Sequence, residues 1–397
     1  MKVGIDFSNV SADAGGGYTF ENEIFTAFLE EAHVSKHDYT IFSNNSNVEK
    51  AISHSDLSNV HFVKVPSEGL IKRNIRRAYF LLGQIFPSLH KINESLYRKS
   101  QIDIMIFFSP LRPALDIPYI TTVWDLEHKK QPWFPEVSSM NVWNGREKGY
   151  LNTLGRASFI LTGTKCGKEE IIRFYNLPQN RIRVIPFPTP RFALNNNNKE
   201  KSTNIIQKYE IHGEYLFYPA QFWAHKNHIN LLYCLKILHD KYSLKLSLVL
   251  VGSDKGNLDH VQRMIKELDL SNYVYFLGFV SQEEIIDLYQ KAFALTFVSF
   301  FGPDNLPPLE AFALGCPVIA SCMSGSEEQL GDAALLVNPL KPEEIAHAVY
   351  QLYCDKQLCD QLIQKGLIRA DNWKGNDYIK AIFALLNEFE NVRRCWD

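Results

Sequence analysis

The order of apolar and polar positions along the chain predicts two α/β domains. Short apolar runs, such as Val3 to Phe7, alternate with longer amphipathic segments, such as Tyr18 to Ala32. Apolar runs of this length predict buried strands, and apolar positions at helical spacing predict the helices that cover them. The strands predicted in the first half are 3–7, 39–42, 60–65, 104–107, 120–123 and 159–162. This alternation favours a parallel sheet with helices on both faces.

The alternation breaks around residues 184 to 204 and then starts again. The stretch VIPFPTPRFALNNNNKEKS contains three prolines and four consecutive asparagines, which cannot build an apolar core. We therefore predict an N-terminal domain over 1–190 and a C-terminal domain over 191–375. The strands predicted after the break are 215–218, 246–251, 274–277, 294–297, 318–320 and 334–337, and the helices are 227–241, 259–268, 281–291, 309–314, 342–355 and 378–392.

Composition narrows the class of protein. The 397 residues carry 42 basic and 44 acidic side chains, a formal net charge of -2, which creates no field that would attract a polyanion. We therefore do not expect nucleic acid as a partner. The start MKVGIDFSNV becomes charged too soon for a signal peptide, and no window approaches twenty uninterrupted apolar residues. Seven scattered cysteines suggest reduced thiols, so we expect a cytoplasmic protein.

One stretch carries the most specific signal in the chain. Residues 301–321, FGPDNLPPLEAFALGCPVIAS, resemble the donor-site signature of the retaining glycosyltransferases of family 4, in a subgroup with an FGPxNLPPLEA loop. The resemblance extends to TGTKCGKEEIIRFYNLPQNRIRVIPFP, YPAQFWAHKNHINLL and GSEEQLGDAALLVNPLKPEEIAHAV, which together cover nearly the whole second half. It is looser in the first half, where a glycine loop and TTVWDLEHKKQPWFPE carry it.

The resemblance implies a fold and an activity. The expected fold is α/β with two Rossmann-like doubly wound domains facing each other (GT-B), and with the last helix, 376–397, crossing back to the first domain. The expected enzyme moves a hexose or deoxyhexose from a UDP-, GDP- or dTDP-linked sugar to a glycan or lipid-linked saccharide. It keeps the anomeric configuration, needs no metal ion or other cofactor, and serves bacterial surface polysaccharide synthesis, such as O-antigen or capsule.

Such a transfer calls for groups that neutralise a departing diphosphate. The glycines Gly15, Gly16 and Gly17 follow the first predicted strand and open a helix, where exposed amides and the positive helix end suit an anion. A tight strand-to-helix turn is the alternative. A dinucleotide fingerprint is disfavoured, because Phe20 stands at the place of its third glycine and no acidic residue ends the second strand.

A lysine and a glutamate of the second half match the donor site of the family. Lys226 follows the strand 215–218 in the sequence HKNH, where its ammonium can reach a diphosphate. The family has an Arg where this chain has Gln221, which we keep as a possible hydrogen-bonding contact. Glu310 begins the helix after PDNLPP, and its carboxylate can accept hydrogen bonds from the two hydroxyls of a ribose. The amides of Asp304 to Leu306 are expected to meet the sugar and the diphosphate.

The chain departs from the family pattern just upstream. The first Glu of the family falls at Ser299, and the extra residues Pro303, Asp304 and Asn305 lengthen the loop. Asp304 or Asn305 can replace the missing carboxylate in binding sugar hydroxyls. A turn built by Pro, Asp and Asn is an equally good explanation.

The first half offers candidates for binding an acceptor. Trp124 takes the place of a family His at the end of the strand 120–123, and the next residue, Asp125, can orient an acceptor or cap a turn. His128 is a further candidate. Tyr18, just after the glycines, can line the same pocket or pack the helix.

Basic and apolar side chains alternate between residues 71 and 100. This amphipathic pattern suits peripheral contact with an anionic membrane, although a solvated helix with an apolar stripe is the alternative.

Two other functions stay open for the chain: a non-catalytic nucleotide-sugar-binding protein, which Ser299 and Gln221 favour, and a nucleotide-sugar epimerase of the same fold. The sequence has no DxD pair near the end of a predicted strand, so it does not imply a metal ion.

Overall fold

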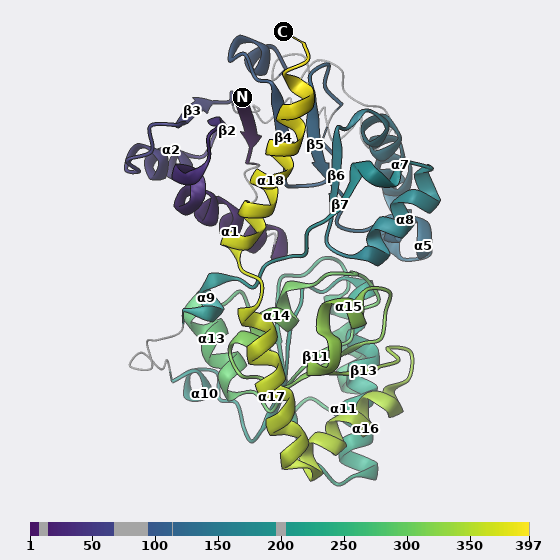
Figure 1. Ribbon diagram of the computed structural model, residues 1–397. Helices are drawn as coiled ribbons and strands as arrows, with labels where there is room; N and C mark the ends of the chain where they lie inside the picture. Colours follow the sequence, from purple (N-terminus) through teal and green to yellow (C-terminus); the bar gives the residue numbers. More distant parts are fainter. Residues whose placement is uncertain (8–14, 67–93, 113, 196–203, 397) are drawn as a thin grey trace. The chain divides into compact units, whose positions relative to one another are not determined.

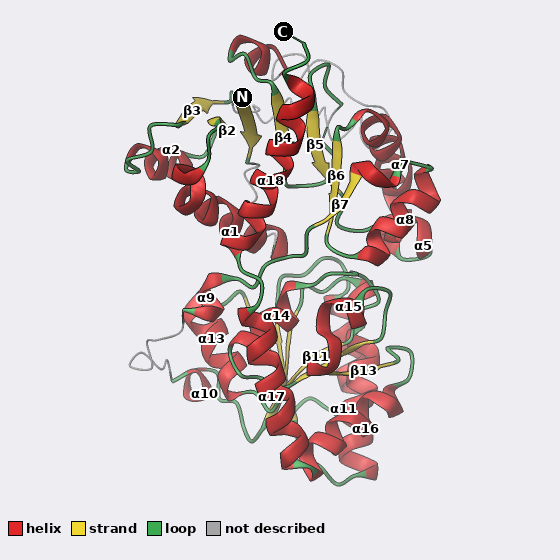
Figure 2. Cartoon of the chain, viewed as in Figure 1, coloured by secondary structure: helices red, strands yellow, loops and turns green. Residues whose placement is uncertain are grey.

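The computed structural model describes residues 1–7, 15–66, 94–112, 114–195 and 204–396. The chain divides into two compact units, the first formed by Met1–Pro186 together with Gly375–Asp397, and the second by Phe187–Lys374. Each unit has a central sheet with helices packed around it (Figures 1 and 2). Both units are Rossmann-like domains, because their strands run parallel and doubly wound.

In the described part of the first unit the sheet has seven strands in the order β3-β2-β1-β4-β5-β6-β7. Its strands are β1 (Lys2–Asp6), β2 (Asp38–Ser43), β3 (Val60–Lys64), β4 (Ile104–Phe107), β5 (Tyr119–Thr122), β6 (Phe159–Thr162) and β7 (Ile182–Val184). Its α-helices are α1 (Gly16–Glu31), α2 (Ser46–Ser53), α5 (Glu127–Lys130), α6 (Pro135–Ser138), α7 (Val142–Thr153), α8 (Lys165–Tyr175) and α18 (Gly375–Arg393), with 3₁₀ turns η2 (Ala32–Val34), η3 (Ser139–Asn141), η4 (Leu154–Arg156) and η5 (Gln179–Arg181).

Among the described residues of the second unit, six strands form a sheet in the order β10-β9-β8-β11-β12-β13. The strands are β8 (Tyr215–Pro219), β9 (Ser247–Val251), β10 (Val274–Gly278), β11 (Ala294–Phe297), β12 (Val318–Ser321) and β13 (Ala334–Val337). The α-helices are α9 (Arg191–Leu194), α10 (Ile205–Lys208), α11 (His228–Lys241), α12 (Leu258–Glu267), α13 (Gln282–Lys291), α14 (Leu306–Ala313), α15 (Ser326–Leu330), α16 (Pro342–Cys354) and α17 (Lys356–Asp371), with 3₁₀ turns η7 (Ala224–Lys226) and η8 (Gly331–Ala333).

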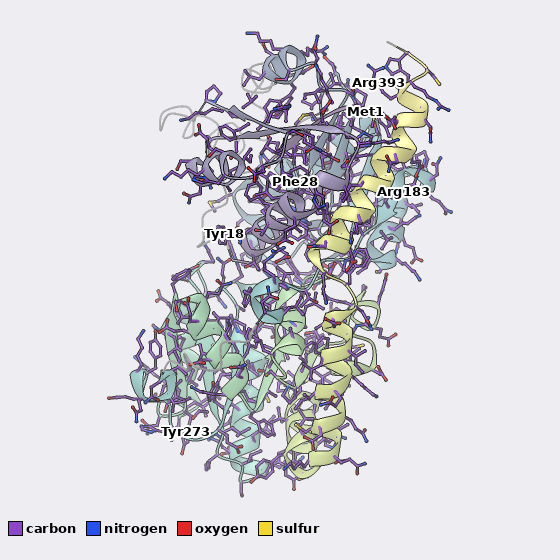
Figure 3. The ribbon with its side chains drawn as sticks, turned by 60° about the vertical axis from the view of Figure 1, so that its left-hand side comes forward. Met1, Tyr18, Phe28, Arg183, Tyr273 and Arg393 are labelled. Carbon is purple, nitrogen blue, oxygen red and sulfur yellow. The ribbon has the colours of Figure 1, made fainter. Side chains whose placement is uncertain are left out.

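The last helix, α18, packs on α1 and belongs to the first unit. Gly375 permits the close approach, because a Cβ there would lie 2.4 Å from Glu23 Oε1. The Phe383 ring lies 5.7 Å from the ring of Tyr39. Figure 3 shows Arg183 beside this helix, where it pairs with Glu388, and Arg393 at the end of the helix, where it pairs with Asp103. Apolar packing and ion pairs therefore both fasten α18 to the first unit.

The sequence pattern predicted most strands correctly, since β4, β6, β11 and β13 have the expected bounds and the others differ by one or two residues at an end. The strand β7 was missed. It is short, lies at the sheet edge and has the charged Arg183 at its centre, so it carries almost no apolar signal. A capping box starts α13, because Ser281 Oγ accepts from the Glu284 N–H (3.3 Å) and Glu284 Oε2 accepts from the Ser281 N–H (2.8 Å).

Candidate functional site

The glycine turn after β1 starts helix α1. Gly15 is the N-cap at φ 70°, a backbone conformation that favours glycine, and its carbonyl accepts from the Tyr18 N–H (2.9 Å). Gly17 faces the indole of Trp124, because a Cβ on Gly17 would lie 3.3 Å from that ring. The first turn of α1 contains no acidic residue, so no carboxylate of that turn offsets the positive end of this helix.

Two candidate acceptor residues lie around this turn. Tyr18 is 41% exposed, so the alternative that it packs the helix fits less well than a surface role (Figure 3). Trp124 is half-buried and packs edge-on against Phe20, with ring centroids 5.8 Å apart. Trp124 thus closes over the glycine turn from the end of β5.

Asp125 is tied to an arginine of helix α7. Its Oδ1 accepts from Arg146 (2.6 Å) and from the Glu127 N–H (3.0 Å). Burial opposes the charge, but the ion pair with Arg146 and the hydrogen bond from the Glu127 N–H together keep the pKa of Asp125 below its usual value. The carboxylate therefore both caps the next turn and stays ionised, which suits orientation of a ligand better than proton transfer.

His128 does not fit the acceptor contact expected from the sequence. It has no exposed surface, and its ring packs between Trp143 (5.9 Å) and Tyr150 (5.7 Å). Its Nε2 lies 3.2 Å from Glu147 Oε2, while burial lowers its pKa to about 4. His128 is a buried, neutral residue, and its contact with an acceptor stays a prediction that this burial disfavours.

The second unit places its candidate residues at a topological switch point. The strand β8 has β9 on one side and β11 on the other, so the loops after β8 and β11 leave in opposite directions. Ligands of doubly wound sheets bind at the carboxyl ends of such strands. Lys226 ends the turn that follows β8, and Glu310 lies in the helix that follows β11.

The loop after β8 is fixed to its neighbours before it reaches Lys226. The Phe222 N–H donates to the Ser253 carbonyl (3.0 Å). Gln221 donates to Ser253 Oγ (3.3 Å) and accepts from the indole N–H of Trp223 (3.0 Å). The Gln221 amide thus binds Trp223 of its own loop and Ser253 of the loop after β9, so it joins the two loops where the family Arg would supply charge.

Lys226 reaches across the switch point. The Tyr218 hydroxyl donates to its carbonyl (2.6 Å), and Asn227 continues at φ 60° with its amide donating to the Val298 carbonyl (2.9 Å). The Lys226 ammonium lies 5.0 Å from the ring centroid of Phe297, the last residue of β11. The cation therefore lies between the ends of β8 and β11.

Ser299 fills the place where the family has its first Glu. It is 2% exposed, and its Oγ donates to the Phe301 carbonyl (3.1 Å) and accepts from the Phe301 N–H (3.2 Å). The Phe301 ring stacks on His225 with centroids 4.1 Å apart. Ser299 therefore stabilises a turn of the loop, at the position where the family has the carboxylate of its first Glu.

Glu310 is buried in the middle of α14. The helix starts at Leu306, earlier than the sequence indicated, because prolines are tolerated in a first helical turn. Glu310 is 9% exposed, and its Oε2 accepts from the Tyr289 hydroxyl (2.8 Å). Burial raises the pKa of Glu310 to about 7, against the opposing effect of that hydrogen bond.

The start of α14 offers few amides. Pro307 and Pro308 have no N–H, and the Asn305 N–H donates to Gln329 Oε1 (3.0 Å). Of the three amides expected to meet the donor, that of Asn305 is therefore occupied. Leu306, the first helical residue, keeps its N–H at the positive end of the helix.

Asp304 and Asn305 bind their own loop. Asp304 Oδ2 accepts from the Phe187 N–H (2.9 Å), and Oδ1 accepts from the Gln329 amide. The Asn305 amide donates to the Gly302 carbonyl (2.7 Å). The added residues were explained either by contact with a sugar or by a turn formed by Pro, Asp and Asn. These hydrogen bonds favour the turn. Burial raises the pKa of Asp304 to about 7.

A family model matches most of the second unit. Residues 201–369 match the model "Glycosyl transferases group 1". Lys226 and Glu310 both lie inside the matched range.

Relatives of known name match about half of the chain. The O-antigen chain mannosyltransferase B of Escherichia coli is 27% identical over 229 residues, which are 56% of this chain and 59% of that protein. The O-antigen chain mannosyltransferase RfbU of Salmonella typhimurium is 33% identical over 184 residues, or 46% of this chain and 48% of that protein. The chain thus matches only half to three-fifths of the length of these relatives.

Solved structures match the whole chain at low identity. Sucrose-phosphate synthase from Thermosynechococcus elongatus has a TM-score of 0.74 at 16% identity, covering 98% of this chain and 99% of that one. A glycosyltransferase from Rickettsia africae ESF-5 has a TM-score of 0.70 at 16% identity, covering 98% of both chains. These matches support the fold with two Rossmann-like domains.

The sequence analysis missed three residues that support the candidate site residues. Gln329 holds the loop before α14, Tyr289 binds Glu310, and Arg146 binds Asp125. Each is distant in sequence from the residue that it supports, so no local spacing indicates it. Their signal would be a covarying pair across several sequences.

Two further observations concern metal ions and membranes. In the described ranges no three His, Cys, Asp or Glu side chains converge as ligands of a metal ion. None of the helices described combines the length and apolar character needed to cross a bilayer. The basic segment proposed for a membrane surface, 71–100, lies outside the described residues up to position 93.

Proposed function

We propose that this protein is a retaining, metal-independent glycosyltransferase of family 4 that moves a hexose or deoxyhexose from a nucleotide diphosphate sugar to a glycan or lipid-linked saccharide. The observation that carries the proposal is the position of Lys226 and Glu310 on the two sides of the switch point, within a glycosyltransferase group 1 domain. The names of the relatives support a role in bacterial O-antigen or related surface polysaccharide synthesis. We propose that the enzyme works at the cytoplasmic side of the membrane.

In this proposal the bond from the anomeric carbon to the diphosphate oxygen breaks while the acceptor oxygen bonds to the same face of that carbon. The proton of the acceptor hydroxyl passes to the departing phosphate, so no pair of protein carboxylates is needed. Lys226 neutralises the growing charge, with the Leu306 amide as a further phosphate contact. Glu310 accepts from the ribose hydroxyls, and Asp125, held ionised by Arg146, orients the acceptor.

The relatives suggest which donor to test first. Two carry mannosyltransferase in their names, and solved structures of similar fold contain UDP or UDP-glucose. We therefore propose mannose as the first sugar, with GDP-mannose, UDP-glucose and a dTDP-linked deoxyhexose as the donor panel.

A non-catalytic nucleotide-sugar-binding protein is the second candidate. It is favoured by Gln221 and Ser299, since both replace charged family residues and both bind only loop atoms in the contacts described above. Such a protein would bind the donor through Lys226 and Glu310 without releasing its nucleotide.

The test is release of the nucleoside diphosphate from each donor, with and without a mannose-containing acceptor and with EDTA present. We expect acceptor-dependent release that EDTA leaves unchanged, with a product of the same anomeric configuration as the donor. Donor binding without release would support the binding protein. Conversion of the donor without an acceptor would support an epimerase, and an inverted product would contradict the retaining mechanism.

A further inference from the structure

A second polar cluster lies at the switch point of the first sheet. Here β1 lies between β2 on one side and β4 on the other. Asp6 ends β1 and lies next to Phe107, the last residue of β4. Arg112 follows in the loop after β4. By the rule that places ligands in doubly wound sheets, Asp6 and Arg112 lie at the ligand-binding edge of this unit.

The two charged groups form an open pair. The Arg112 guanidinium lies 3.6 Å from Asp6 Oδ1, which is beyond hydrogen-bonding distance, and it donates instead to Ser109 Oγ (3.1 Å). Asp6 Oδ2 accepts from the Tyr97 hydroxyl (2.8 Å). A guanidinium has five N–H donors and a carboxylate about four acceptor positions. Both groups therefore keep capacity for a ligand, and both side chains reach solvent, at 12% exposure for Asp6 and 24% for Arg112.

The backbone before Arg112 is strained. Leu111 has φ 58°, a conformation that costs a residue with a side chain about 1 kcal/mol or more. A Cβ on Gly149 would lie 3.1 Å from Leu111 Cδ2, so the Leu111 side chain rests against α7. Such a strained backbone conformation is kept only where the surrounding packing holds it. Here the held conformation of Leu111 determines the direction of the chain at Arg112.

A second Asp–Arg pair of the same unit, Asp103 and Arg393, differs from Asp6 and Arg112 in its hydrogen bonding. Asp103 precedes β4 and so lies at the amino-terminal edge of the same sheet, and Arg393 donates to its Oδ1 through both Nε (3.0 Å) and a terminal nitrogen (2.8 Å). The exposures of these two side chains, 20% and 22%, resemble those of Asp6 and Arg112. Asp103 and Arg393 are thus hydrogen-bonded directly to each other and attach α18 to the sheet, whereas Asp6 and Arg112 are too far apart for a direct hydrogen bond.

From this geometry we infer that Asp6 and Arg112 form a subsite for neighbouring hydroxyl groups of a neutral saccharide. A hydroxyl can donate to the Asp6 carboxylate while its neighbour accepts from the Arg112 guanidinium. The pair has no net charge, so the attraction of a phosphate to Arg112 would be offset by its repulsion from Asp6. Assignment of this saccharide as the acceptor rests on the proposed function, but its binding to Asp6 and Arg112 does not.

The test measures binding of methyl α-D-mannopyranoside, methyl β-D-galactopyranoside and methyl N-acetyl-β-D-glucosaminide to the full chain by NMR titration. The variants are Asp6→Asn, Arg112→Gln and the matched control Asp103→Asn, each checked for an unchanged melting temperature. We expect at least one glycoside to bind, with affinity about tenfold lower in the two site variants and unchanged in the control. Affinity for GDP and UDP should stay the same in all of them.

Three results would overturn the inference. They are no binding of any glycoside by the unchanged protein, equal binding by the two site variants, or equal loss in Asp103→Asn. Inorganic phosphate is the competing probe, and phosphate binding that depends on Arg112 and displaces the glycoside would show an anion site instead. Failure of the proposed function looks different, because nucleotide release would be absent while glycoside binding still depended on Asp6 and Arg112.

Discussion

At the scale of single residues, Lys226 supplies the positive charge that the proposed transfer needs. We predict that Lys226→Gln lowers kcat about a hundredfold or more, because a cation aimed at a leaving diphosphate acts mainly in the transition state. The measurement is acceptor-dependent release of the nucleoside diphosphate. The matched control is Lys236→Gln, which removes a surface lysine of α11 paired only with Asp240 (3.1 Å). Equal kcat in the Lys226 variant and the control would contradict this role.

Glu310 should make donor binding depend on pH. Burial raises its pKa to about 7, so the carboxyl is protonated below that pH and accepts hydrogen bonds from a ribose less well. We predict that affinity for the nucleotide rises as the pH increases through about 7 and then levels off. Glu310→Gln should bind about tenfold more weakly at pH 8 and lose this dependence. Titration calorimetry between pH 5.5 and 8.5 checks it, and an unchanged pH profile in the variant would show that another group titrates.

At the scale of elements, the loop before α14 owes its shape to Gln329 of α15. The Gln329 side chain contacts Asp304 and both the N–H and the carbonyl of Asn305 (3.0 and 2.7 Å). We predict that Gln329→Ala raises KM for the donor about tenfold and changes kcat less, because the loop positions Leu306 without taking part in bond breaking. Steady-state kinetics measure the split. The control Gln282→Ala alters an exposed residue of α13, and a fall in kcat with unchanged KM would refute the positioning role.

The elements could largely be predicted from sequence because most strands are uninterrupted apolar runs. Ile104–Phe107 and Ala294–Phe297 are buried at every position, as expected for strands covered on both faces. The start of α14 was placed too late, since two prolines imitate a loop. The candidate site residues were chosen from motifs and stay predictions, whereas the residues that support them could not be chosen in this way. Whether Asp304 binds a sugar or a turn depends on contacts with Phe187 and Gln329, which no spacing reveals.

At the scale of the whole molecule, two buried carboxyls should make stability fall as pH rises. Asp304 and Glu310 both have a pKa of about 7 in the folded chain, against 3.8 and 4.5 as ordinary values. Between those values the folded state binds more protons than the unfolded state, so the free energy of unfolding decreases with increasing pH, by up to about 1.4 kcal/mol per pH unit for each group.

This contribution is largest below pH 4 and is lost by about pH 7. Urea unfolding at a series of pH values measures it in the intact protein, and Asp304→Asn and Glu310→Gln should each flatten the slope between pH 5 and 7. Slopes identical to that of the unchanged protein would mean that neither carboxyl is protonated in the folded state.

The central claim is that Lys226 and Glu310 together hold the nucleoside diphosphate of a sugar donor. The most direct measurement is the Kd of GDP and of UDP for the intact protein and for the double variant Lys226→Gln/Glu310→Gln, by titration calorimetry at pH 8. We predict that the preferred nucleotide binds at least a hundredfold more weakly to the double variant, while its melting temperature without ligand does not fall. Equal affinity of the two proteins for both nucleotides would contradict the claim.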